Sequence, residues 1–205
     1  MRKQQLVEMN NLIKSTFYEM FGDPVTNEKR WEFTTINDVC SDIVDCPHST
    51  PLHSDIPTNY PSIRTSELQN GDINWSLMKY VTETEYLIRI SRIKPQENDI
   101  IYGREGSYGD AVVLPSGYSF CLGQRVMLLR ANAEICHYKF LWYVVCSDYV
   151  YNQAKRKNVG ATVGHVNVGD IKKFILPLPP LSIQEQFAEI VIKIEETKRA
   201  YAKRN

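Results

Sequence analysis

Residues 175–201 read ILPLPPLSIQEQFAEIVIKIEETKRAY and join a short apolar stretch, three prolines and a long run without proline or glycine. Pro179-Pro180 indicates a linker between a strand predicted over 172–176 and a helix, since the residue before a proline avoids helical geometry. Ser182 and Glu185 have the spacing of a capping box that starts a helix. Steps of four and three then predict a coiled-coil seam made of Ile183, Phe187, Ile190, Ile194, Thr197 and Tyr201. We therefore predict a helix over 182–201, about 30 Å long.

A second amphipathic helix is predicted at the other end of the chain, over residues 4–21. Apolar residues recur there at steps of three, four or their sum, namely Leu6, Met9, Ile13, Phe17 and Met20. Gly22-Asp23-Pro24 is typical of a helix end. Two helices with apolar seams need cover, so we expect them to pack against each other or against a second copy of the chain.

Residues 31–176 show a different pattern, with β-branched and aromatic stretches broken by glycine, proline, asparagine and aspartate. Strands are predicted near 61–65, 99–102, 110–114, 125–130 and 172–176. A helix is predicted over 137–157, with a strand as the alternative, and its inward residues would be Phe140, Leu141, Val144, Val145 and Tyr149. The expected fold class is α+β, in which a β-rich domain (25–181) lies between an N-terminal helix (1–24) and a C-terminal dimerisation helix (182–205).

The charges are balanced overall but not locally. The 24 basic and 24 acidic residues exclude a histone-like polycation, so only a local excess of positive charge could attract a polyanion. Residues 32–62 hold five acids and no lysine or arginine, whereas residues 151–173 hold five bases and one acid. The second segment is therefore the better candidate for a polyanion contact.

No membrane, secretory or metal-binding signal is recognised. The longest apolar run, residues 140–146, is far shorter than the roughly 20 residues of a membrane helix, and the N-terminus lacks an apolar signal core. The five cysteines show no paired short spacing, which fits reduced thiols in a cytoplasmic protein. A zinc site at Cys46, His48 and His53 is disfavoured because no C-x-x-C pair supports it.

Motifs for catalysis are also weak. A methyltransferase would need a glycine-rich cofactor loop and a polar residue beside its Pro-Pro-aromatic motif, and neither occurs. Glu196-Thr197-Lys198 lacks an acidic partner for nuclease chemistry. The loop from Gly103 to Gly109 lacks the lysine of a nucleotide-hydrolysing loop, so a β-turn and a DNA-backbone contact both stay open. We therefore expect no enzyme activity, no cofactor and no metal.

The remaining polar groups suit recognition of DNA. Arginine and glutamine can pair with guanine and adenine edges, whereas lysine mostly meets phosphate. Residues beside turn signals are expected to project from loops toward base edges, namely Arg64, Arg104, Gln124 and Arg125. A basic run, Lys155, Arg156 and Lys157, is expected on phosphates. For any single arginine the alternative is a surface ion pair.

The chain resembles a single target-recognition module of the DNA specificity subunit of type I restriction-modification systems. The stretches that carry the resemblance are, in order, Phe17 to Pro24, Trp31 with Ile36 to Val39, Pro61 to Thr65, Asn98 to Gly109, Gly123 to Arg125, Gly160 to Val166, and Ile175 to Gln186. Five more residues of these stretches are added to the DNA-binding candidates, namely Thr65, Ser107, Tyr108, Thr162 and His165.

The resemblance implies a non-catalytic subunit that binds double-stranded DNA and directs methyltransferase and restriction subunits to a split site. Members of the family usually hold two modules separated by long helices, and each module reads half of the site. This chain has only one, so it is either a half-length subunit that dimerises or half of a longer protein. A spacer of about 30 Å approximates one duplex turn of about 34–36 Å. The alternative function is an adaptor that acts through its helices without reading DNA.

Overall fold

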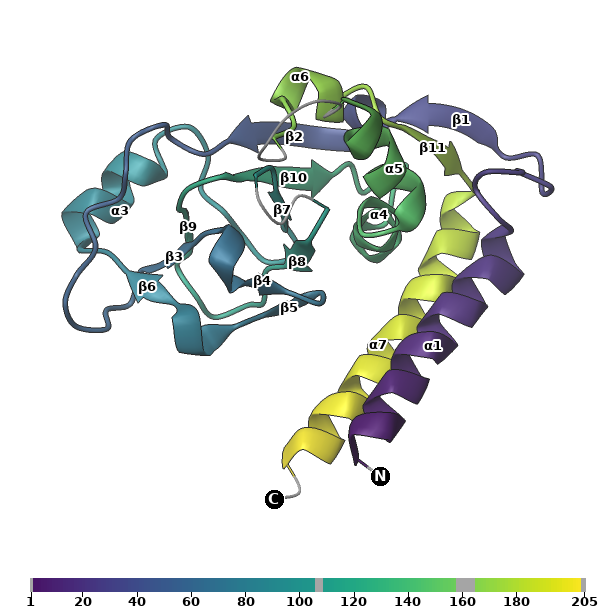
Figure 1. Ribbon diagram of the computed structural model, residues 1–205, viewed down its shortest axis with the longest axis horizontal. Helices are drawn as coiled ribbons and strands as arrows, with labels where there is room; N and C mark the ends of the chain where they lie inside the picture. Colours follow the sequence, from purple (N-terminus) through teal and green to yellow (C-terminus); the bar gives the residue numbers. More distant parts are fainter. Residues whose placement is uncertain (1, 106–108, 158–164, 204–205) are drawn as a thin grey trace.

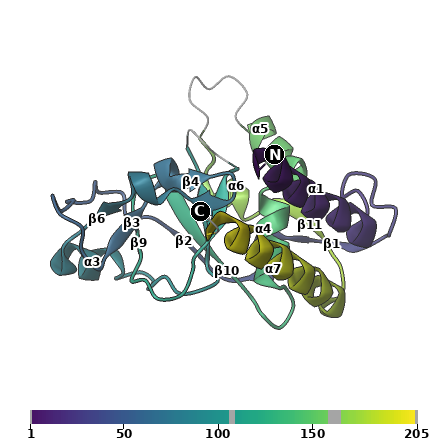
Figure 2. The ribbon, with the colours of Figure 1, turned by 90° about the horizontal axis from the view of Figure 1, so that it is seen from below.

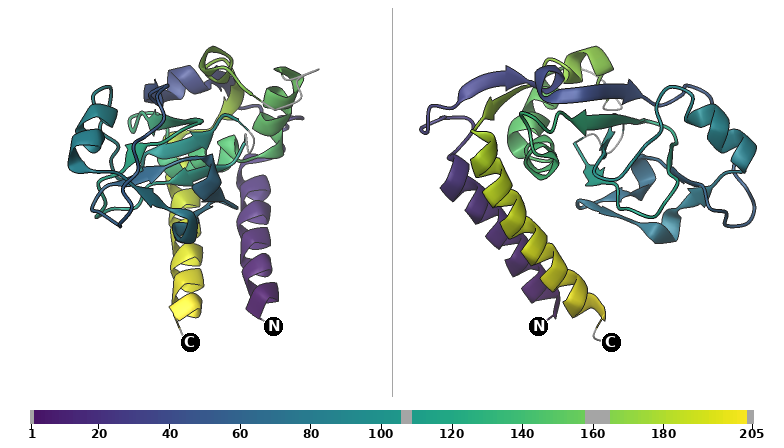
Figure 3. Two further views of the ribbon diagram at one scale, coloured as in Figure 1. Left: turned by 60° about the vertical axis from the view of Figure 1, so that its left-hand side comes forward. Right: turned by 180° about the vertical axis from the view of Figure 1, so that it is seen from behind.

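A computed structural model describes residues 2–105, 109–157 and 165–203. A β-rich body carries two long helices, α1 (Arg2–Phe21) and α7 (Leu181–Lys203), which lie side by side and project from one end of the body (Figure 1). Both chain termini lie at the far end of this helix pair (Figure 3). The α+β class is confirmed.

The body is built on a central antiparallel sheet with the strand order β2-β10-β7-β8. Its strands are β2 (Cys40–Asp45), β7 (Ile100–Gly103), β8 (Ala111–Val113) and β10 (Val126–Ala131). Three of these were predicted to within two residues at each end, because their apolar runs are bounded by glycine, asparagine and aspartate. The strand β2 was missed, since its alternating sequence CSDIVD holds two acids.

Smaller sheets complete the body. A mixed sheet places β3 (Pro61–Ile63) between antiparallel β6 (Lys79–Tyr80) and parallel β9 (Cys121–Leu122). A hairpin joins β4 (Leu68–Gln69) to β5 (Asp72–Ile73), and β1 (Glu32–Thr35) pairs with β11 (Ile175–Leu178). The mixed sheet and α3 (Glu83–Arg89) lie at the end of the body away from the helix pair (Figure 2).

The inner strands of the central sheet, β7 and β10, are buried on both faces. Along β10, Met127 and Leu129 face a core shared with the helices, whereas Val126 and Leu128 face a second core shared with the mixed sheet. Because successive side chains of a strand point to opposite faces, a strand that separates two cores is continuously apolar. This explains why β10 does not alternate between apolar and polar residues.

The two long helices cover each other and the central body through a cluster of aromatic rings. Phe17 and Phe21 of α1 lie with ring centroids 5.6 and 5.3 Å from Phe187 of α7, and Phe21 lies 5.0 Å from Phe140 of α4 (Tyr138–Val145). Of the two expected arrangements, packing of the helices against each other within one chain is therefore present.

The apolar seam of α7 differs from the predicted heptad. Phe187 is fully buried, but Ile183 and Ile194 are only partly buried and Ile190 is 37% exposed, while Ala188 and Val191 are buried instead. The reason is that α7 packs against both α1 and α4, so its buried stripe is wider than a two-helix seam. The side chain of Tyr201 lies outside the described residues.

Two predicted boundaries are wrong for local reasons. The helix α7 begins at Leu181, and the carbonyl of Pro180 accepts from the Ile183 N–H at 3.0 Å, so Ser182 lies inside the helix rather than at its cap. The region 137–157 is divided into α4 and α5 (Asp148–Lys157), because the Ser147 hydroxyl and N–H both donate back to the carbonyl of Val144.

A third predicted boundary is also displaced. The strand expected over 172–176 is β11 and starts at Ile175, because α6 (Val168–Ile171) and the turn after it precede the strand. Other short elements were not predicted, namely α2 (Ile36–Val39) and the 3-10 turns Thr65–Glu67 and Trp75–Leu77. Within the described ranges, no helix is both long and apolar enough to cross a membrane.

Candidate nucleic-acid interface

Four chain segments, three of which carry predicted DNA-binding residues, meet at one edge of the central sheet. The strands β2 and β7 end there and β10 begins there, since Asp45 is paired with Met127 and Gly103 with Val126. The edge is the one nearer α3 (Figure 1). The segments are 46–50 after β2, 104–105 after β7, 123–125 before β10, and 165–167. We call their exposed surface the edge surface.

Backbone hydrogen bonds join these segments. The Arg104 N–H donates to the carbonyl of Arg125 at 2.9 Å, and the Val166 N–H donates to the carbonyl of Arg104 at 3.0 Å. The Cys46 N–H donates to the carbonyl of Val126 at 3.2 Å. Antiparallel register thus brings together residues that are far apart in the sequence.

Gln124 and Arg125 form the most prominent turn of the edge surface. Gly123 precedes them and donates its N–H to the carbonyl of Ile63 at 2.7 Å. A Cβ atom at Gly123 would lie 2.3 Å from Arg64 Cγ and 2.6 Å from the Ile63 oxygen, so only glycine fits. Arg125 has φ 64°, a left-handed conformation that directs its side chain outward, where it is 63% exposed.

Both side chains of this turn have weak surface partners. Arg125 Nε lies 3.2 Å from Glu105 Oε2, and Gln124 Nε2 donates to Thr50 Oγ1 at 3.0 Å. An exposed ion pair is worth about 0–1 kcal/mol. A ligand can therefore displace Glu105 at little cost.

Arg104 does not project from a loop, so the expectation is wrong for this residue, and Arg64 is only partly exposed. Arg64 pairs with Glu67, whose side chain is fully buried, and its Nε donates to Glu67 Oε2 at 3.2 Å. Arg104 is 6% exposed, and its Nη2 lies 2.9 Å from Asp45 Oδ1. A buried guanidinium needs a paired carboxylate, so Arg104 supports the edge surface from inside. Thr65, also a candidate, is partly buried at the start of its 3-10 turn.

Arg89 is a supporting residue that the sequence reasoning missed. Its side chain is fully buried, and its Nε donates to the carbonyl of Leu122 at 2.7 Å and its Nη2 to that of Gly123 at 3.0 Å. It also forms an ion pair with Glu85 at 3.3 Å, one helical turn earlier on α3. The spacing of Glu85 and Arg89 is visible in the sequence, but it is equally typical of a solvent-exposed helix pair.

His165 lies at the other side of Glu105. Its Nδ1 is 2.9 Å from Glu105 Oε1 and its Nε2 is 3.2 Å from Asn167 Oδ1. Glu105 thus lies between His165 and Arg125 and holds both side chains at the edge surface. Three further candidates, Ser107, Tyr108 and Thr162, lie outside the described residues.

The basic run lies on the last turn of α5. Lys155, Arg156 and Lys157 are all exposed there, and Lys157 Nζ lies 3.6 Å from Asp170 Oδ1 of α6. The pair connects the end of α5 to the helix that follows His165. Cations at a helix C-terminus are stabilised by the helix dipole, so positive charge here is compatible with the fold.

The acidic segment 32–62 is less negative than its sequence suggests. Asp45 is paired with Arg104, and Asp42 Oδ2 lies 3.5 Å from Arg130 Nη1. Within the same segment, burial and the positive charge of Arg64 lower the pKa of His53. In the described part of the chain, no group of three histidine, cysteine or acidic residues is placed to bind a metal. The five cysteines, all described, form no disulfide, and burial raises the pKa of Cys121 to about 11.

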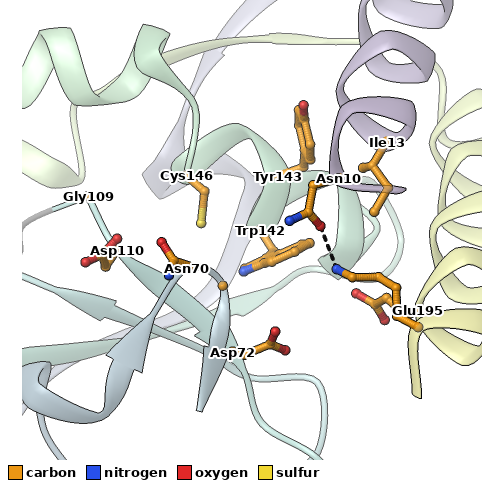
Figure 4. A pocket seen from close by; sticks show the side chains of 12 residues that line it. Asn10, Ile13, Asn70, Asp72, Gly109, Asp110, Trp142, Tyr143, Cys146 and Glu195 are labelled. Carbon is orange, nitrogen blue, oxygen red and sulfur yellow. Dashed lines mark hydrogen bonds between the residues drawn. The ribbon is translucent and has the colours of Figure 1, made fainter. Parts of the chain in front are cut away.

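A cleft of about 250 Å³ lies on another side, between the β4–β5 hairpin, α4 and the long helices (Figure 4). Three of its lining residues are acids, Asp72, Asp110 and Glu195, and burial raises the pKa of Asp110. Lys198 Nζ donates to Asn10 Oδ1 at 2.6 Å and links α7 to α1 beside it. Carboxylates repel phosphate, so the edge surface is the better nucleic-acid candidate.

Comparison with known proteins points to one family. Residues 28–204 match the family described as type I restriction modification DNA specificity domain. The chain is 25% identical over 178 residues to the type I restriction enzyme MjaVIII specificity subunit of Methanocaldococcus jannaschii, a match that covers 87% of this chain and 38% of that protein.

Two solved structures are similar in fold. The HsdS subunit from Thermoanaerobacter tengcongensis has a TM-score of 0.60 at 16% identity, covering 98% of this chain and 46% of that one. The S subunit of a type I restriction-modification system from M. genitalium has a TM-score of 0.64 at 11% identity, covering 98% and 52%. The chain therefore spans about half the length, or less, of the proteins it matches.

Proposed function

This chain belongs to the type I restriction-modification DNA specificity domain family, and from that premise we propose that it binds double-stranded DNA as one target-recognition module. The observation that carries the proposal is the Gln124-Arg125 turn, in which Arg125 is exposed and Gln124 partly exposed at the edge surface, while buried groups hold the backbone in place. A rigid turn that presents an amide and a guanidinium is suited to reading base edges in the major groove.

The roles are divided between base and phosphate contacts. Arg125 would leave Glu105, an exposed pair worth about 0–1 kcal/mol, for a guanine contact worth about 1–3 kcal/mol. The exchange is favourable. Lys155, Arg156 and Lys157 would neutralise phosphates and supply affinity that does not depend on sequence.

The long helices would provide the connection to other subunits. Because the chain spans about half of its relatives, we propose that a second module, in another copy or in a longer chain, reads the other half of a split site. The 23 residues of α7 extend about 35 Å, close to one duplex turn of about 34–36 Å. Methyltransferase and restriction subunits would then bind to this assembly in the cytoplasm and perform all catalysis.

The test is selection of bound duplexes from a random pool by the purified chain. A single enriched motif, with affinity that falls steeply as salt rises, is the expected result. No retardation of any duplex at low salt, together with normal assembly with partner subunits, would favour the adaptor function instead. Incubation with duplex DNA and S-adenosylmethionine should transfer no methyl group, and transfer would contradict a non-catalytic role.

A further inference from the structure

We infer that residues 47–50 form a second DNA-reading segment, locked to the Gln124-Arg125 turn by Arg89, and that Thr50 orients the amide of Gln124 toward an adenine edge. This inference rests on the proposed function and names the base and the positioning residues of the same surface. It adds a segment of the chain that no motif or resemblance had indicated.

The guanidinium of Arg89 ties the two segments together. On the 122–125 side it donates to the carbonyls of Leu122 at 2.7 Å and Gly123 at 3.0 Å. On the other side it donates to the carbonyls of Ser49 at 3.3 Å and Pro47 at 3.5 Å. A planar guanidinium has five donors in a fixed fork, so one buried group sets the distance between both segments.

The charge of Arg89 makes this link costly to break. Its side chain is fully buried, and Glu85 on the same helix lies 3.3 Å from Nη1. A buried charge that loses its hydrogen-bond partners pays a large desolvation penalty. The two segments are therefore expected to meet DNA as one rigid unit, and the loss of conformational freedom on binding is small.

A side-chain contact completes the unit at its surface. Gln124 Nε2 donates to Thr50 Oγ1 at 3.0 Å. The amide of glutamine has two N–H donors and one carbonyl acceptor, so one N–H and Oε1 stay available for a ligand. Adenine presents an acceptor (N7) next to a donor (N6–H) in the major groove, whereas guanine presents two acceptors. The free edge of Gln124 therefore matches adenine and discriminates against guanine.

The chemistry of residues 48–50 is compatible with a place beside DNA. His48, Ser49 and Thr50 are exposed and none of them is acidic. The carboxylate of Asp45, whose Oδ2 lies 3.8 Å from His48 Nε2, is paired with the buried Arg104 at 2.9 Å. Hydroxyl and imidazole groups can donate to phosphate or to base edges without a charge penalty.

The experiment compares Thr50→Val, which keeps the shape of the side chain and removes the hydroxyl, with Thr50→Ser, which keeps the hydroxyl. Each full-length variant binds the duplex selected by the wild type and the same duplex with each adenine replaced by guanine or by 7-deazaadenine. For Thr50→Val we expect the preference for one adenine to fall by about tenfold, with an unchanged salt slope. Thr50→Ser should keep the wild-type preference, which a purely structural role would not require.

A second variant tests the lock. Arg89→Lys keeps the positive charge and removes the fixed arrangement of guanidinium donors. Discrimination between bases should therefore fall at the positions read by both segments. Melting curves identify the temperatures at which Arg89→Lys is folded. If Arg89→Lys is unfolded at all temperatures, the binding data for Thr50→Val decide whether the inference holds. Wild-type preference in Thr50→Val, while Gln124→Leu alters it, would overturn the role of Thr50.

The inference can fail separately from the proposed function. If the wild-type chain selects a motif in which replacing any adenine leaves the affinity unchanged, the inference is overturned and DNA recognition is retained. A wild-type chain that binds no duplex overturns both.

Discussion

Replacing Gly123 by alanine tests whether the turn of the edge surface depends on close backbone approach. A Cβ atom at Gly123 would lie 2.3 Å from Arg64 Cγ and 2.6 Å from the Ile63 carbonyl oxygen. The first neighbour can move, but the second is backbone that accepts the Gly123 N–H at 2.7 Å. Adding a methyl group to a packed site costs about 1–3 kcal/mol, and the fixed carbonyl places this substitution near 3 kcal/mol, the upper end of that range.

The matched control is Gly169→Ala in α6, where a Cβ atom would meet nothing within 4 Å. Alanine there should stabilise the chain by about 0.5–1 kcal/mol, because it restricts the unfolded chain and fits helical geometry. The two glycine substitutions are therefore expected to have opposite signs.

Urea and thermal unfolding measure both variants. A loss of about 3 kcal/mol corresponds to a fall in Tm of about 6–12 °C for a chain of this size. Below its Tm, Gly123→Ala should also lose sequence preference, since the turn that presents the reading side chains is displaced. If its unfolding free energy stayed within about 0.5 kcal/mol of the wild type, close approach would not be what fixes the turn.

Three further predictions concern the exposed cations, a buried amide and a helix cap. Arg125→Ala should relax sequence preference in duplex selection, whereas Lys157→Ala should weaken all duplexes and reduce the salt slope by about one unit; equal losses on every duplex would contradict this division. Gln184 is fully buried, donates to the carbonyls of Pro179 and Ile135 at 2.7 and 3.2 Å, and accepts from a backbone N–H at 2.9 Å. Gln184→Ala should therefore lower the free energy of unfolding in urea by about 2–4 kcal/mol, whereas Gln186→Ala, at an exposed position of the same helix, should leave it unchanged. The neutral His137 ring accepts from a backbone N–H at 3.2 Å at the start of α4, and burial lowers its pKa from 6.5. The unfolded chain therefore binds the proton more readily, so stability is complete above pH 6.5 and is lost as the pH falls through the lower folded-state pKa. His137→Asn should keep the cap and flatten this part of the pH profile of Tm, and an unchanged profile would assign the dependence to other groups.

The elements of this fold that depend on local pattern were predictable from the sequence. The helical periodicity of 4–21 and 182–201 predicted α1 and α7, because a helix repeats its faces every three to four residues regardless of its surroundings. The strands β7 and β10 were predicted because a short apolar run bounded by turn residues is typical of a buried strand. Local pattern did not show that β2 lies beside them, since pairing depends on register across distant segments.

For the candidate site, the sequence did not predict which arginines are exposed. Arg64, Arg104 and Arg125 each stand beside a turn signal, and the sequence treats them alike. The structure pairs the first two with Glu67 and Asp45, so that the side chain of Arg64 is 19% and that of Arg104 7% exposed, and leaves that of Arg125 63% exposed. Whether a guanidinium faces water depends on which carboxylate the fold brings to it, and no periodicity encodes that partner.

The role of Arg89 was missed for the same reason. The carbonyls that Arg89 binds belong to residues 33 to 42 positions away, and they converge only when α3 packs against β9 and Arg89 reaches the segment after β2. The sequence by itself therefore determined the two long helices, three of the four central strands and the family. The tertiary structure alone decided which polar side chains reach the surface, because burial and ion pairing are set by contacts between segments that the chain order keeps apart.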